Sequence, residues 1–147
     1  MTEMDAILRI LVSLVLGLAI GIERELAHHD AGIRTFTLVT LGSTLAMLMS
    51  IYVCESNTNL LNGDPGRIAA QVVTGIGFIG AGVIMKKDNS INGLTTAACI
   101  FISAIIGLAV GSGMLLLPSV VTVIILLVLI IPRIVRKKLG NYNKDND

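Results

Sequence analysis

The sequence predicts an all-α protein that crosses a membrane several times, as a bundle of about five transmembrane helices. Hydrophobic residues make up 54% of its 147 residues and charged residues only 14%, whereas soluble domains carry roughly 25% charged residues. The mean hydropathy is +0.85. The apolar residues also lie in long runs and not in amphipathic stripes. Because lipid offers the backbone no hydrogen-bond partner, such runs are expected to be helices.

Five apolar runs are long enough to be membrane spans. Each holds about 17–18 residues, near the shortest length that crosses roughly 30 Å of hydrocarbon. Between the last two runs the sequence is Gly111-Ser112-Gly113, which predicts a turn. The five predicted spans cover residues 6–22, 36–53, 68–85, 94–110 and 114–131.

The basic residues indicate how these spans are oriented. Lys and Arg occur in the first and third connections and in the tail, whereas the second and fourth connections hold none within them. By the positive-inside rule, the N-terminus then lies outside and the C-terminus in the cytoplasm. Arg9 and Arg67, near the outer ends of two spans, are expected to extend toward the outer interface. We expect residues 1–135 to form the transmembrane domain and residues 136–147 a short cytoplasmic tail, first basic and then polar.

The third run carries polar residues that a purely lipid-facing helix does not need. On a helical wheel, Arg67, Gln71 and Thr74 share one broad face, and glycines on both sides of the helix would let neighbours approach closely. The pattern predicts a central helix, with Gln71 hydrogen-bonded in the bundle interior. The polar face either joins helices or lines a polar cavity or coupling site, and both interpretations stay open. The glycines are Gly75, Gly77, Gly80 and Gly82.

The spacing of three of these glycines also matches the dinucleotide-binding pattern. That pattern requires a soluble strand–turn–helix unit with an acidic residue about 20 positions later. Here the glycines lie inside a predicted membrane span, so we reject the nucleotide interpretation and predict no cofactor. Because the sequence also offers no nucleophile–base pair, we do not expect an enzyme.

Charged residues follow the first run. Gly17 and Gly21 near its end form a GxxxG pair, a pattern that packs helices closely. The charges at the cytoplasmic boundary are Glu23, Arg24 and Glu25. They form either an ordinary charged helix end or an ion-pair network with Arg34, which would fix the short loop against the bundle.

Two further motifs flank the spans. His28, His29 and Asp30 in the first loop leave a metal site open, although adjacent histidines in a polar loop are more often exposed to solvent. Gly93 precedes the fourth run, and Thr95 and Thr96 open it. Two successive threonines at a helix start can cap the helix or bond back to a carbonyl oxygen.

Taken together, these motifs resemble the MgtC/SapB family of bacterial membrane proteins. The resemblance implies a multi-pass protein of the bacterial cytoplasmic membrane, tied to growth under magnesium limitation and to survival inside host phagocytes. It also implies one of two functions that are ascribed to the family, regulation of the F-type ATP synthase or magnesium transport. The matching blocks are residues 21–25, 31–35, Asp64 with 67–78, 80–82 and 93–98.

The sequence departs from the family pattern in two places. Many members carry a soluble C-terminal domain, whereas this sequence is expected to lack one because it stops after a basic tail. Members often have Trp a few positions after the Thr-Thr-Ala-Ala motif, where this chain has Cys99, Ile100 and Phe101.

Two functions are compatible with these features. A regulatory protein that contacts a membrane partner is favoured by the small size, the glycine faces and the scarcity of acids inside the spans. A cation or proton pathway is the alternative, supported by the acids Glu55 and Asp64 at the outer face and by the polar face of the third run. Mg²⁺ needs octahedral oxygen ligands, and Arg67 beside the acids would repel cations. We expect a lipid bilayer and a second copy of the chain, as a homodimer, to be partners, and no nucleic acid.

Overall fold

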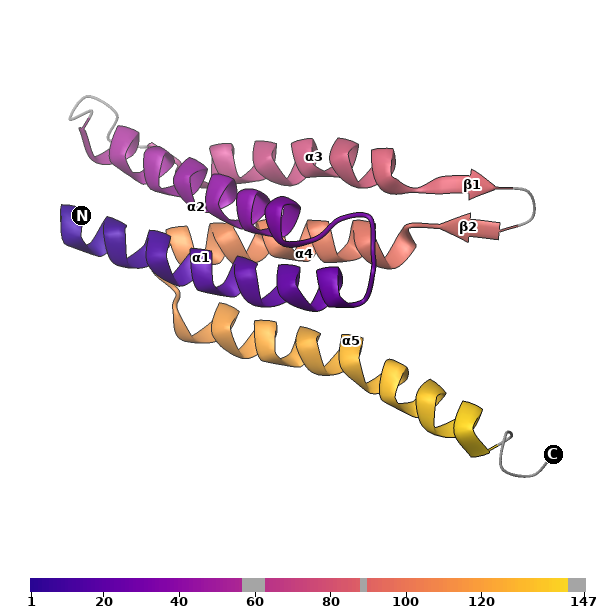
Figure 1. The fold of residues 1–147 in the computed structure, drawn as a ribbon. Helices are drawn as coiled ribbons and strands as arrows, with labels where there is room; N and C mark the ends of the chain where they lie inside the picture. Colours follow the sequence, from indigo (N-terminus) through magenta and orange to yellow (C-terminus); the bar gives the residue numbers. More distant parts are fainter. Residues whose placement is uncertain (57–62, 88–89, 143–147) are drawn as a thin grey trace.

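In the part of the chain that the structure describes, five helices and one short hairpin make up the fold (Figure 1). The computed structural model describes residues 1–56, 63–87 and 90–142, and their side chains except at 85–87, 90, 133 and 136–142. The elements are α1 (Glu3–Leu26), α2 (Ile33–Ser56), α3 (Gly66–Val83), β1 (Met85–Lys87), β2 (Ser90–Asn92), α4 (Leu94–Gly111) and α5 (Leu116–Tyr142).

The predicted all-helical membrane protein is confirmed, with one refinement of its spans. Among the described residues, four helices, α1 to α4, are long and apolar enough to cross a membrane. The apolar part of α5, Leu116–Pro132, is shorter. It begins later than predicted because Gly113 adopts a left-handed backbone, with φ of 99°, and the Met114 amide turns back to the Ala109 carbonyl oxygen.

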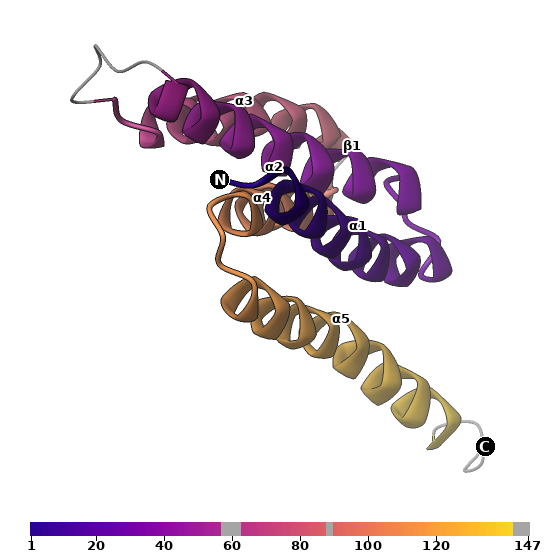
Figure 2. The same cartoon turned by 90° about the vertical axis from the view of Figure 1, so that its left-hand side faces the viewer.

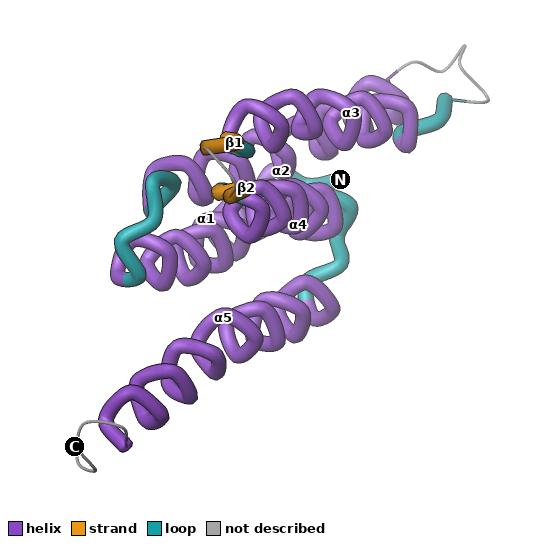
Figure 3. The backbone as a smooth tube through the Cα atoms, turned by 90° about the vertical axis from the view of Figure 1, so that its right-hand side faces the viewer, coloured by secondary structure: helices purple, strands orange, loops and turns teal. Residues whose placement is uncertain are grey.

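The third connection contains a hairpin that the sequence did not predict. β1 and β2 pair antiparallel, with Lys86 opposite Ile91, and lead into α4 (Figure 3). Gly93 joins the hairpin to α4 with φ of 87°. A Cβ atom there would collide with the Val83 carbonyl oxygen, so the close return of the chain past the end of α3 requires glycine.

Alternation of the helices brings the predicted basic segments to one end. In Figure 1, the loop after α1, the hairpin and the C-terminal end of α5 lie at the same end, and the N-terminus lies at the other. This arrangement agrees with the alternation from which the orientation was inferred. Which end faces the cytoplasm stays a prediction.

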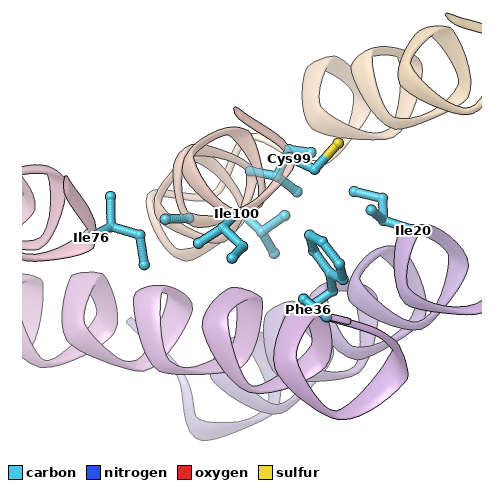
Figure 4. Close-up of a cluster of buried hydrophobic side chains, with 9 residues drawn as sticks. Ile20, Phe36, Ile76, Cys99 and Ile100 are labelled. Atoms are coloured by element: carbon cyan, nitrogen blue, oxygen red, sulfur yellow. The ribbon is translucent and has the colours of Figure 1, made fainter. Parts of the chain in front are cut away.

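The core lies where α1, α2 and α4 meet. Ile20 of α1 and Phe36 of α2 point toward each other beside Ile100 of α4 (Figure 4), and all three are fully buried. Glycines make this close packing possible, because a Cβ on Gly21 would lie 2.7 Å from the Ile33 Cα. A Cβ on Gly107 of α4 would collide with the Thr40 carbonyl oxygen of α2.

In contrast, α3 and α5 lie at the margins. Ile76 is the one buried residue of α3 among those described, so the prediction of a central helix is wrong for the single chain. The physical reason is that α2 and α4 pack on each other directly, as the buried Thr44 hydroxyl of α2 donates to the Gly107 carbonyl oxygen at 2.9 Å. α5 extends away from the bundle toward the C-terminus (Figure 2).

We predict that Gly107→Ala destabilises the bundle, whereas Gly42→Ala does not. The first change inserts a methyl group against backbone of α2, and overpacking of this kind costs about 1–3 kcal/mol. Gly42 is exposed on α2 with nothing within 4 Å of an added Cβ, so it is the matched control. Thermal unfolding in detergent measures both. Equal midpoints for the two variants would show that the α2–α4 contact is looser than described.

Candidate functional site

A buried ion pair lies in the last turn of α1. The Arg24 Nε donates to Glu23 Oε2 at 2.6 Å, and Glu23 and Arg24 are only 7% and 3% exposed. The second carboxylate oxygen, Glu23 Oε1, is buried without a hydrogen-bond partner among the described residues. Leaving such an acceptor unsatisfied costs roughly 1–3 kcal/mol. The ion pair therefore has an acceptor for which the described residues supply no donor.

This pair opens into a hollow between three helices. The hollow has a volume of about 540 Å³ and lies between the end of α1, the start of α4 and the middle of α5. Its polar wall includes Glu23, Arg24 and the exposed Thr95. Its apolar wall includes Val128, Leu129 and Pro132 of α5. Charged groups and an apolar surface thus face one space at the end of the bundle that carries the basic loops.

The other two boundary charges have separate places. Glu25 is exposed, and its Oε2 accepts a hydrogen bond from the Ile33 amide at 3.1 Å, at the start of α2. A side chain on Gly32 would collide with this carboxylate. Arg34 is exposed and forms no ion pair with another described residue. The four-membered network, one of the two interpretations of these charges, is therefore not formed among the described residues, because Glu25 is used to satisfy a helix N-terminus.

The loop histidines lie at the same end of the molecule. His28 has a left-handed backbone, with φ of 57°, and both His28 and His29 are exposed. His29 borders the hollow, and its amide donates to the Arg24 carbonyl oxygen at 3.2 Å. The described residues hold no group of three or more His, Cys, Asp or Glu side chains that could bind a metal ion.

The polar residues of α3 share a face that no described helix covers. Arg67, Gln71 and Thr74 are all exposed, and Phe78 is 77% exposed. The Thr74 hydroxyl donates to the Ala70 carbonyl oxygen at 3.1 Å within its own helix, whereas Gln71 makes no side-chain hydrogen bond to another described residue. The prediction that Gln71 bonds inside the bundle is wrong for the single chain.

The glycines of α3 are largely open. Nothing lies within 4 Å of a Cβ added to Gly75, Gly77 or Gly82, and of the four predicted packing glycines only Gly80 approaches a neighbour, Ala97 of α4 at 3.8 Å. By contrast, the two predicted packing glycines of α1 are in use. A Cβ on Gly17 would lie 3.0 Å from the Thr37 Cα of α2, a contact slightly longer than the 2.7 Å at Gly21.

The remaining predicted residues lie at helix ends. Asp64 is exposed, and its Oδ1 accepts from the Gly66 amide at 2.8 Å, at the start of α3. Thr96 is buried at the start of α4, whereas Thr95 is exposed. Gly93 supplies the turn before α4. The structure therefore divides the predicted site residues between the hollow, the α3 face and helix termini.

Sequence reasoning missed the role of Arg9. Its Nη1 donates to the Gly111 carbonyl oxygen at 2.7 Å, and the side chain is partly buried. The expected extension to the outer interface is therefore replaced by a contact with the C-terminus of α4, where a positive charge is favoured by the helix dipole. The signal available in the sequence was an arginine within an apolar run, near the end of the bundle at which the Gly-Ser-Gly turn was also predicted.

Comparisons with known proteins give a consistent result. A sequence model of the MgtC family matches residues 10–138. The chain is 46% identical over 127 residues to an Escherichia coli K12 protein named "Putative magnesium transporter YhiD", which covers 85% of this chain and 59% of that one. It is 42% identical over 116 residues to "Protein MgtC" of Brucella abortus, covering 78% of this chain and 45% of that one.

A third relative is a protein from Synechocystis. The chain is 40% identical over 110 residues to an uncharacterized Synechocystis protein, slr0014, covering 75% of this chain and 44% of that one. This chain spans about half the length of the curated relatives it matches. No solved structure matches it.

We predict that Arg24→Gln destabilises the protein more than the double change Glu23→Gln with Arg24→Gln. The single change leaves the Glu23 carboxylate buried without its cation, which costs about 3–5 kcal/mol. The double change removes both charges, and its cost is expected to be smaller. Chemical or thermal unfolding of the variants in detergent gives the comparison.

The matched control for this measurement is Arg34→Gln, which removes an exposed arginine near the same end. Its effect is expected to lie within about 0.5 kcal/mol of zero, as for most surface changes. If the double variant is as unstable as Arg24→Gln, the buried pair stabilises the fold by something other than charge compensation, and this account of it is incorrect.

Proposed function

Because the chain belongs to the MgtC family, we propose that it is a regulatory membrane protein of magnesium homeostasis that acts through helix contacts with another membrane protein. The proposed location is the bacterial cytoplasmic membrane. The role is not enzymatic: the protein changes the activity of its partner and catalyses no reaction of its own.

The exposed polar face of α3 is the observation that carries this proposal. Gln71 has both hydrogen-bond donors and an acceptor, and it lies on an apolar helix at a depth where lipid offers no partner for them. A neighbouring helix with a polar side chain would satisfy it, and such contacts contribute roughly 0.6–2 kcal/mol in membranes. Gly75 and Gly82 leave room for that helix to approach closely.

The family resemblance suggests the membrane sector of the F-type ATP synthase as the partner. The α3 face would fit a transmembrane helix that has small residues and at least one polar side chain at the level of Gln71. A second copy of this chain meets the same description, because an amide can pair with an identical amide. The homodimer is therefore the competing occupant of the face.

Transport of Mg²⁺ or protons is the second candidate function. It is supported by the name of the Escherichia coli relative and by the buried carboxylate of Glu23. Against it, the Arg24 guanidinium lies 2.6 Å from that carboxylate, and a cation would have to enter beside this positive charge. We therefore favour regulation.

The contact test uses a photo-crosslinking residue at position 78 in the native membrane. Phe78 is the most exposed large apolar residue of α3, and it lies on the face of Gln71. We expect a defined crosslinked product that weakens when Gln71→Leu is added, because the apolar substitute removes the hydrogen bond. Val123, 56% exposed on α5, is the control position away from α3 and should give no such product.

The identity of the product decides between occupants. A product containing an ATP synthase membrane subunit would support the named partner. The protein should then change the rate of ATP-driven proton pumping in inverted membrane vesicles, and Gln71→Leu should abolish this change. A product of twice the chain mass would assign the face to a homodimer. If position 78 gives no product that position 123 lacks, the regulatory contact through α3 is refuted.

The transport test uses purified protein in liposomes. We expect no Mg²⁺ or H⁺ flux above that of protein-free liposomes when a gradient is imposed. A robust flux that is lost in Glu23→Gln would overturn the regulatory proposal in favour of transport, whereas Arg34→Gln serves as the control for a charge change near the same end.

A further inference from the structure

The incomplete ion pair at the end of α1 has hydrogen-bonding capacity left on both partners. Glu23 Oε1 is buried and accepts no hydrogen bond from a described residue. Arg24 donates to a described residue only through Nε, so its two terminal nitrogens keep their donors. Both side chains line the hollow of about 540 Å³. A ligand that fits this hollow must therefore present an acceptor for the guanidinium and a donor for the carboxylate.

We propose that the hollow binds the head group of a phospholipid with a primary ammonium next to its phosphate, of the phosphatidylethanolamine type. Phosphate oxygens accept hydrogen bonds from a guanidinium in a forked geometry. The ammonium donates to the free carboxylate oxygen of Glu23. The ligand and the ion pair are each electrically neutral, so binding leaves no uncompensated buried charge, which would be costly.

Other ligands match the same groups less well. A magnesium ion needs octahedral oxygen coordination. In this hollow it would find one carboxylate and would be repelled by the positive charge of Arg24. Inorganic phosphate would satisfy Arg24 but place a negative charge beside Glu23. A choline head group carries the phosphate, but its quaternary nitrogen has no N–H to donate to Glu23 Oε1. The requirement for a donor is what distinguishes ethanolamine from choline.

The position of the hollow also fits a lipid head group. The 24 residues of α1 span about 36 Å at roughly 1.5 Å per residue, more than the hydrocarbon thickness of about 30 Å. Its last turn, with Glu23 and Arg24, therefore lies near the boundary between the hydrocarbon and the head groups. The opposite wall consists of Val128, Leu129 and Pro132 of α5. This apolar wall would contact the glycerol and the first methylene groups of the acyl chains.

The test places the full chain in lipid nanodiscs that contain phosphatidylcholine and one competing lipid with the same acyl chains. The competitors are phosphatidylethanolamine and its N-methyl and N,N-dimethyl forms. Mild extraction and native mass spectrometry then measure which lipid stays bound. We expect each lipid with at least one N–H to be enriched about fivefold or more over phosphatidylcholine, which corresponds to one retained hydrogen bond.

Variants locate the preference at the ion pair. Glu23→Gln should reduce the enrichment to near parity, because a neutral amide attracts an ammonium weakly. Arg34→Gln should leave it unchanged, since Arg34 is exposed and does not line the hollow. If Glu23→Gln does not fold, the double variant with Arg24→Gln removes both charges together, and the methylation series on the unmodified protein gives the answer without any substitution.

Soluble probes separate a lipid from other sources of the same chemistry. Phosphoethanolamine, inorganic phosphate and MgCl₂ are each titrated against the protein in detergent, with thermal stability as the readout. Stabilisation by phosphoethanolamine without lipid enrichment would assign the site to a soluble metabolite and overturn the lipid proposal. Glu23-dependent stabilisation by MgCl₂ would identify a cation site. Equal retention of ethanolamine and choline lipids would show that the hollow has no head-group preference and would refute the inference.

Discussion

The close approach of α2 to α1 and α4 is the contact on which the rest of the structure depends. In lipid, helices gain little from burying apolar surface against each other, so association rests on close packing and on polar contacts. Gly21 and Gly107 remove the side chains that would hold these helices apart. The Thr44 hydroxyl then reaches the carbonyl oxygen of Gly107. A bundle held in this way has a core of three helices, and every other element is attached to it.

This arrangement explains why the polar face of α3 is exposed. Because α2 already fills the glycine grooves of α1 and α4, α3 can only pack on the outer side of α2 and α4, with Ile76 as its buried contact. The side of α3 that carries Gln71 is then directed away from the bundle. A polar face that is exposed in the single chain would be stabilised by a neighbouring helix that satisfies its hydrogen bonds. The packing of the fold therefore leads to the proposed regulatory contact.

The hollow beside Glu23 and Arg24 follows from the same packing. α1 is held by α2 and α4, whereas α5 diverges from them (Figure 2), so a space remains between the last turn of α1 and the apolar side of α5. The ion pair lies in that space without its full set of hydrogen bonds. The α3 face and the hollow are on different elements, and a ligand in one does not require a partner on the other.

The sequence by itself determined the number, order and approximate limits of the helices, because the length and polarity of apolar runs are local properties. It also identified Gly17, Gly21 and the charged end of α1 as noteworthy. Only the tertiary structure decided which charges pair and which faces are covered. Glu25 bonds to the amide of Ile33, so it is separated from its neighbours in sequence. Arg9 reaches the end of α4, more than a hundred residues away, because the first turns of α1 lie beside the last turn of α4. Whether Gln71 faces the interior or the outside depends on which helices occupy the centre, and a helical wheel describes one helix without its neighbours.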